Sequence, residues 1–328
     1  MAIAFLSFNA CQRNPLKPDI SGIDIKINIK RLDSDLFKVT PQNQNSLIAE
    51  LRKNYGEFFT LYNENIIALG DPSDSQYPSY LQAFLKDSMR IASKNKVDSV
   101  FNSLNWLEKE LETAFRYYKY YFPQKEVPQV YTIISGFNQS VVTTSNALGI
   151  SLDNYLGVKC PYYRMLGLPE YKKMNMYPEK IPTDVLYAWA LSEFEQNDIN
   201  DNLLSEMIYQ GKLMYFLDCM LPDDPDYIKI GYQPNKTEWC KEHENGMWTY
   251  LIENKLLYTT DRMNIRRFIG PGPFTSSFTN ESPGKAGVWI GWQIVRHYMK
   301  KNPNISLADL MEENDSQKIL SQSRYAPE

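Results

Sequence analysis

Residues 130–157 read VYTIISGFNQSVVTTSNALGISLDNYLG, and this stretch decides the fold. Runs of β-branched and aromatic residues at 130–135 and 140–144 flank a turn-forming sequence at 136–139. A third run of the same kind follows at 147–152. We therefore predict a small sheet in which the first two strands pair antiparallel and residues 147–152 form the edge strand.

Helical periodicity surrounds this sheet on both sides. Apolar residues recur at helical spacing in segments 43–59, 78–94, 97–122, 182–197, 202–221, 236–255, 286–301 and 306–313. Ser306 has the form of a capping residue for the last of these. Upstream, Ile23, Ile25, Ile27 and Ile29 alternate with polar residues, which predicts a half-buried strand. The pattern predicts an α-rich α+β fold, with residues 23–328 as one domain.

Composition narrows the possible functions. The chain has 328 residues, a net charge of −4 and a hydrophobic content of 43%, which is ample for a large core. No basic stripe is present, and this argues against a nucleic-acid partner because phosphate binding needs concentrated positive charge. Cys160, Cys219 and Cys240 form no C-x-x-C, so neither a redox motif nor a zinc knuckle is indicated.

The N-terminus, MAIAFLSFNAC, is apolar and uncharged, and it ends in a small residue before Cys11. Residues 1–10 have the form of a lipoprotein signal peptide, truncated at its start because no Lys or Arg precedes the apolar run. We predict that Cys11 carries acyl chains such as palmitate and that residues 11–22 are a tether. Gln12, without a following acidic run, favours a periplasm-facing position in the cell envelope. The alternative is an ordinary buried first strand.

Four further blocks carry a family resemblance. They are Tyr209–Pro222, Thr237–Asp261 with Trp239 and Trp248, Phe268–Thr275 and Gly287–Arg296. Together, and in this order, they resemble the gliding motility lipoprotein B (GldB) family over nearly the whole chain, from Cys11 to the C-terminus. The order of helix, small sheet and paired helices is similar to that of zincin metallopeptidases.

The resemblance implies a role in cell-surface gliding and a zincin-like fold that has lost its zinc motif. The helix at 183–195, TDVLYAWALSEFE, lies where H-E-x-x-H is expected and has no histidine. Gln210-Gly211 replaces a Glu-Gly pair of related predicted peptidases. The two histidines, His243 and His297, are too distant to supply ligands four residues apart. His243-Glu244 imitates the motif for two residues only. We predict no metal, no cofactor and no catalysis.

The candidate degenerate cleft comprises Asp184, Glu193, Gln210 and Gly211. Asp184 and Glu193 are nine positions apart on one helix and point in different directions, so no acid–base dyad is indicated. Glycine inside a helix costs about 1 kcal/mol relative to alanine, so Gly211 predicts a close backbone neighbour. In the zincin layout that neighbour is the helix at 182–197.

Three functions remain open. The first is a lipid-anchored scaffold that binds envelope proteins of the gliding and surface-secretion machinery. Its old cleft would hold an extended peptide by strand addition along 147–152. The second is an envelope hydrolase, peptidase-like, with an unrecognised active site. The third is a glycan-binding lipoprotein, suggested by the clustered Trp239, Trp248, Trp289 and Trp292.

Overall fold

A computed structural model describes residues 14–198 and 200–328 of the chain. The strands are β1 (Lys30–Arg31), β2 (Gln129–Ile133), β3 (Val141–Thr143) and β4 (Ala147–Ser151). The helices are α1 (Leu32–Asp35), α2 (Gln44–Leu61), α3 (Tyr77–Lys86), α4 (Ser88–Val100), α5 (Asn105–Tyr121), α6 (Pro161–Met165), α7 (Glu170–Lys173), α8 (Ile181–Glu193), α9 (Leu203–Met220), α10 (Asp226–Ile230), α11 (Pro234–Glu242), α12 (Glu244–Glu253), α13 (Arg262–Ile269), α14 (Ala286–Lys301), α15 (Leu307–Glu312) and α16 (Ser316–Ser323). The α-rich α+β class is therefore confirmed.

The sheet has the order β1-β2-β4-β3, and this corrects two predictions. β2 pairs parallel with β4, not antiparallel with β3, and β3 pairs antiparallel with β4. Residues 147–152 do not form the edge strand, because β4 is paired on both sides and all five of its residues are buried. The two edge strands are β1 and β3. The tight hairpin forms across Ser145-Asn146 and not across 136–139.

The loop at 135–139 explains why β2 and β3 do not form a hairpin. Gly136 and Phe137 both have positive φ angles, 72° and 65°. The carboxylate of Asp153, which follows β4, accepts hydrogen bonds from the backbone N–H groups of Ser135 and Phe137. The loop is thus folded towards the end of β4, and β4 can take the place beside β2.

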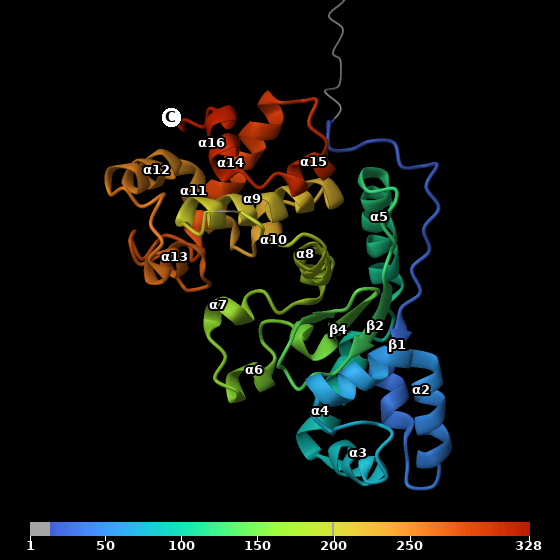
Figure 1. Cartoon of the computed structure of the whole chain (residues 1–328). Helices are drawn as coiled ribbons and strands as arrows, with labels where there is room; N and C mark the ends of the chain where they lie inside the picture. The colour runs from blue at the N-terminus through green and yellow to red at the C-terminus, as the bar shows by residue number, and fades with distance from the viewer. Residues whose placement is uncertain (1–13, 199) are drawn as a thin grey trace, which may run out of the picture.

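The two faces of the sheet bury different cores. Tyr131 and Ile133 of β2 join a cluster with α2 and α3, whereas Leu148 and Ile150 of β4 join a larger cluster that includes α5, α8, α9 and α14. Figure 1 shows the sheet between the N-terminal helices α2 to α4 and the central helix α8. At Gly149 a side chain would collide with the ring of Phe58 from α2, so glycine permits this close packing.

The segment 23–29 is extended but is not a strand of the sheet, so that prediction is wrong. Its alternation is real, because Ile27 and Ile29 are buried between exposed polar residues. Its backbone partners are side chains of a helix: the N–H of Ile27 donates to Glu112 and that of Ile29 to Glu108, both on α5. Strand pairing begins only at Lys30. Figure 1 shows this segment running beside α5 towards β1.

Contacts with the protein body extend into the predicted tether. Leu16 and Ile20 pack against the larger core, and Lys17 forms an ion pair with Asp223. Cys11 and residues 1–10 lie outside the described part of the chain.

Three predicted helices are each divided in the structure. The segment 97–122 is interrupted at residues 101–104, between the end of α4 and the start of α5. The segment 78–94 is interrupted at Asp87, whose side chain accepts the N–H of Arg90 and so caps α4. The segment 236–255 is interrupted at His243, between α11 and α12. The predicted cap at Ser306 is confirmed as a capping box with Asp309.

The packing of α9 against α14 forms the centre of the larger core. A side chain on Gly211 would overlap the backbone carbonyl of Gly291, and one on Gly291 would overlap that of Met207. The prediction of a close backbone neighbour at Gly211 is therefore confirmed, but its identity is corrected. The neighbour is α14, and not the helix at 182–197. We call this contact the α9–α14 seam.

An ionic cluster centred on the buried Asp218 lies at the same seam. The carboxylate of Asp218 on α9 accepts hydrogen bonds from Lys229, from the indole of Trp292 and from Arg296, with distances of 2.7 to 2.9 Å. Arg296 also makes a bidentate pair with Asp226 of α10. These bonds join α9, α10 and α14 through charges that are matched within the protein.

Candidate functional site

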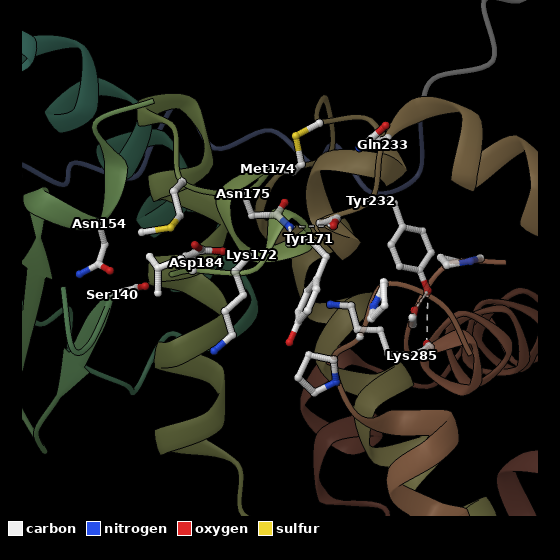
Figure 2. A pocket seen from close by; sticks show the side chains of 18 of the residues that line it. Ser140, Asn154, Tyr171, Lys172, Met174, Asn175, Asp184, Tyr232, Gln233 and Lys285 are labelled. Carbon is white, nitrogen blue, oxygen red and sulfur yellow. Dashed lines mark hydrogen bonds between the residues drawn. The ribbon is translucent and has the colours of Figure 1, made fainter. Parts of the chain in front are cut away.

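A cleft of about 410 Å³ opens beside α8, between the end of the sheet and the loops that precede α11 and α14. A second hollow of about 360 Å³ continues from it towards α9, and the two share Asn175, Asp184, Gly231, Pro271 and Lys285. Figure 2 shows Ser140, Asn154 and Asp184 on one side and Tyr232 and Gln233 on the other, with Tyr171 and Lys285 between them. We call this continuous space the cleft.

Asp184 is the predicted site residue that lies in both parts of the cleft. It lies in the first turn of α8. The hydroxyl of Tyr155 donates to one of its carboxylate oxygens at 3.0 Å, and Lys180 approaches the other at 3.2 Å. Its carboxylate is therefore engaged by neighbours within the protein.

Gln210 lies on α9 and lines the inner part of the cleft. Its side-chain carbonyl accepts a hydrogen bond of 2.6 Å from the hydroxyl of Tyr187 on α8. Burial raises the pKa of Tyr187 to about 12, so this hydroxyl stays protonated and keeps donating at neutral pH. The structure brings Asp184 and Gln210 together in the inner part of the cleft.

Glu193 and Gly211 lie elsewhere. Glu193, at the last turn of α8, accepts hydrogen bonds from Tyr118 at 3.0 Å and Lys125 at 2.6 Å. It points towards α5 and does not line the cleft. Gly211 belongs to the α9–α14 seam. The inclusion of these two residues in the predicted cleft is therefore wrong.

His243 and Glu244 have structural surroundings. His243 is exposed, stacks on Trp239 with ring centroids 4.2 Å apart, and lies 2.8 Å from the carbonyl oxygen of Trp239 through Nδ1. Glu244 accepts hydrogen bonds from the indole of Trp289 at 2.9 Å and from Tyr325 at 2.8 Å. Its carboxylate thus ties α12 to α14 and to the C-terminal segment.

The tryptophans do not form one exposed aromatic surface. Trp289 and Trp292 are 1% and 0% exposed and pack against each other in the core. Trp239 and Trp248 remain partly buried. Two of the four tryptophans are therefore inaccessible to a glycan, and a binding surface made from all four does not exist.

Lysines of the cleft are the residues that the sequence analysis missed. Lys172, Lys236 and Lys285 line its outer part, and Lys180 and Lys229 line its inner part. Lys285 is the N-cap of α14 and has a left-handed backbone, with φ 51°. A cation at a helix N-terminus opposes the helix dipole. A lysine directly before a long predicted helix was the signal that could have identified it.

The electrostatic setting of Lys285 is unfavourable for its charge. Burial, together with the nearby ammonium of Lys180, lowers its pKa to about 8, although Asp184 acts in the opposite direction. Within residues 14–198 and 200–328, no hydrogen bond or ion pair reaches its side-chain nitrogen. Lys180, by contrast, donates to the carbonyl of Ile228 at 2.7 Å.

A buried acid fixes one wall of the cleft. Asp153 holds the 135–139 loop, from which Phe137 and Asn138 line the space. Burial raises the pKa of Asp153 to about 6, although hydrogen bonds from the backbone of Phe137 and Ser135 oppose the shift. This carboxylate supports the wall and does not itself line the cleft.

The donor set does not indicate a metal site. In the described part of the chain, no group of three or more His, Cys, Asp or Glu side chains is placed to hold a metal ion. Cys160, Cys219 and Cys240 are buried free thiols, and burial raises the pKa of each. Among the helices of residues 14–198 and 200–328, none combines the length and apolar character needed to cross a membrane.

Comparison with known proteins gives one match. The sequence model of the family described as gliding motility protein GldB matches residues 13–327. No curated protein and no solved structure matches the chain.

Proposed function

Because the chain belongs to the family of gliding motility protein GldB, we propose that it is a non-catalytic, partner-binding component of the gliding and surface-secretion machinery. The cleft beside α8 is the observation that carries this proposal. It is large enough for several side chains of a partner, and its walls combine aromatic, amide and lysine groups.

The polar groups at the bottom of the cleft support binding over hydrolysis. Asp184 is engaged by Tyr155 and Lys180, and Gln210 by Tyr187. A general base must accept a proton from water or substrate, and these bonds compete for the same oxygen atoms. The chain is, on this proposal, a pseudo-peptidase whose zincin-like ancestry left a cleft without its zinc ligands.

An extended peptide could join the sheet at the edge of β3. Antiparallel pairing of Val142 with Gly149 places the backbone groups of Val141 and Thr143 on the side away from β4. Ser140, directly before this edge, lines the cleft. A partner segment that adds to β3 would thus continue into the cleft. β3 replaces residues 147–152 in this role.

We further propose that acyl chains on Cys11 hold the protein at the envelope, with the body facing the periplasm. Each buried acyl methylene contributes roughly 0.8 kcal/mol to membrane binding. The Cys11→Ala protein, expressed with its native start, is expected in the soluble fraction after cell lysis. Unchanged retention in the membrane fraction would contradict a lipid anchor at this residue.

The partner-binding role is tested by blocking the cleft. Ser140→Trp places a large side chain at an exposed cleft residue, and Ser46→Trp makes the same change at an exposed position of α2. We expect the wild type and Ser46→Trp to co-purify with the same envelope proteins from detergent-solubilised membranes and to restore gliding to a deletion strain. Ser140→Trp should do neither. Equal behaviour of both variants would place the partner elsewhere.

The alternative, an envelope hydrolase with an unrecognised site, has a separate test. Purified wild-type protein would be incubated with unfolded protein substrates, with and without EDTA. Cleavage that Asp184→Asn abolishes would contradict the non-catalytic proposal.

A further inference from the structure

The charges of the cleft do not balance. Five lysines line the cleft, whereas Asp184 is the one acidic residue among the described lining residues. Three of the lysines are engaged within the protein: Lys229 with Asp218 at 2.9 Å, Lys180 with Asp184 at 3.2 Å, and Lys236 with the carbonyl of Glu281 at 2.6 Å. A backbone carbonyl does not neutralise an ammonium, so Lys236 contributes to the excess positive charge together with Lys172 and Lys285.

The backbone at Lys285 is held in place by its neighbours. The hydroxyl of Tyr232 donates to the carbonyls of Gly284 at 2.9 Å and Lys285 at 3.2 Å. Gly284 packs so closely on the backbone of Gly272 that a side chain would overlap it. These contacts fix the backbone of Gly284 and Lys285. Lys285 keeps a left-handed backbone conformation that residues with a side chain rarely adopt.

Three features of the free protein oppose the charge of Lys285. They are partial burial, the proximity of Lys180 and the positive end of the α14 dipole. The described residues offer no hydrogen-bonding partner that compensates for them. A carboxylate brought by a ligand would relieve all three, because it pairs with the ammonium and interacts favourably with the helix N-terminus.

The neighbouring edge strand favours a peptide as the carrier of that carboxylate. The outward backbone groups of Val141 and Thr143 recognise an extended main chain and offer nothing specific to a sugar ring. Ser140, Asn138 and Phe137 connect this edge to the cleft that contains Lys285. Aromatic side chains such as Tyr171 and Tyr232 supply apolar contacts along the way.

We infer that the cleft recognises an acidic peptide segment. The carboxylate of this segment pairs with Lys285, and its backbone adds a strand to the sheet beside β3. This inference rests on the proposed partner-binding function. The carboxylate belongs either to an Asp or Glu side chain or to a peptide C-terminus. Both sources present the same group to the ammonium.

The test selects peptides without assuming a partner. A phage library of random twelve-residue peptides is panned on the full chain in detergent. The enriched sequences are synthesised with a fluorescent label, and binding is measured by anisotropy. Each is also made with Glu replaced by Gln or Asp by Asn, and with a C-terminal amide, so that the two carboxylate sources are distinguished.

Lys255→Met is a matched control for Lys285→Met, because Lys255 also has a positive φ, 54°, but is exposed and does not line the cleft. We expect Lys285→Met to weaken binding by about tenfold to a hundredfold, the range of one charge-assisted hydrogen bond. Lys255→Met should have no effect, and Lys285→Arg should retain most of the affinity. Removing the peptide carboxylate should weaken binding to the wild type equally, with no further loss in Lys285→Met.

Several outcomes would overturn the inference. They are enriched peptides without a required carboxylate, equal affinity for the wild type and Lys285→Met, and the absence of any enriched peptide. Binding of an acidic polysaccharide such as alginate, lost in Lys285→Met, would assign the cleft to a glycan instead. If co-purified envelope proteins remain sensitive to Ser140→Trp while acidic peptides fail to bind, the partner-binding function stands and only the acidic ligand is wrong.

Discussion

The α9–α14 seam and the cleft use the same helix in opposite ways. Arg296, in the body of α14, has two carboxylate partners, the buried Asp218 and the partly buried Asp226. Lys285, at the N-cap of α14, has no such partner among the described residues and a pKa lowered by burial. Charges are matched where the helix stabilises the core and unmatched where it borders the cleft. The comparison separates residues that stabilise the fold from residues that are available to bind a ligand.

The largest effect on stability is expected from the matched charges of the seam. Asp218→Asn keeps the shape of the side chain but leaves Arg296 and Lys229 without their shared carboxylate. Removing one partner of a buried ion pair typically costs about 3–5 kcal/mol. Urea unfolding followed by circular dichroism should show a loss of this size. The control is Asp223→Asn, whose carboxylate is exposed, and it should change stability by less than about 1 kcal/mol.

The glycine contacts of the seam should give the next largest effect. Gly291→Ala forces α14 away from the backbone of Met207, and overpacking of this kind costs about 1–3 kcal/mol. Gly246→Ala is the matched control in α12, where nothing lies within contact distance of a new side chain. It should stabilise the protein slightly through better helix propensity. Similar effects of both substitutions would show that α9 and α14 do not meet at these glycines.

Local features of the structure were predictable from the sequence, and their partners were not. The helix-propensity penalty at Gly211 indicated a close neighbour, but helix periodicity does not say which helix approaches. Likewise, alternation in 23–29 correctly predicted the inward face of the segment, on which Ile27 and Ile29 are buried and Ile23 and Ile25 are partly buried. The same alternation arises whether the backbone pairs with a strand or, as here, with Glu108 and Glu112 of a helix.

The site shows the same limit. Asp184 and Gln210 were identified through the family resemblance and do share the cleft. Glu193 was taken, like Asp184, from the helix that stands in the place of H-E-x-x-H, but it lies at the other end of α8, near α5. Lys285 is distant in sequence from Asp184 and reaches the cleft only because α14 packs on α9. Only tertiary packing brings these residues together.

Substitution of Glu244 tests whether this residue stabilises the fold or binds a metal. Glu244→Gln should lower the free energy of unfolding by about 1–2 kcal/mol, because a neutral amide binds the indole of Trp289 and the hydroxyl of Tyr325 less strongly than a carboxylate. We expect gliding to be retained and zinc to be substoichiometric by elemental analysis in both proteins. About one zinc per chain, lost in His243→Ala, would contradict the prediction of a lost zinc site.

The smallest effect, and the one of opposite sign, is expected at Lys285. Its folded-state pKa of about 8 lies below the ordinary value of 10.5, so the unfolded chain binds more protons between these pH values. Stability from this group is therefore lowest below pH 8 and rises as the pH increases through that window. Lys285→Met removes the penalty and should stabilise the protein by about 1 kcal/mol or less at pH 7, once solvent screening is considered.

The pH dependence of that difference tests the contrast between seam and cleft directly. Lys212, whose pKa is also lowered to about 8, titrates in both proteins, so its contribution cancels when the two unfolding curves are subtracted. The advantage of Lys285→Met should shrink as the pH rises from 8 to 9.5. If Lys285→Met is more stable than the wild type and binds acidic peptides more weakly, Lys285 contributes to ligand binding and lowers the stability of the free protein. A destabilised variant with a difference independent of pH would mean instead that the ammonium is paired within the protein, and the cleft would then resemble the seam.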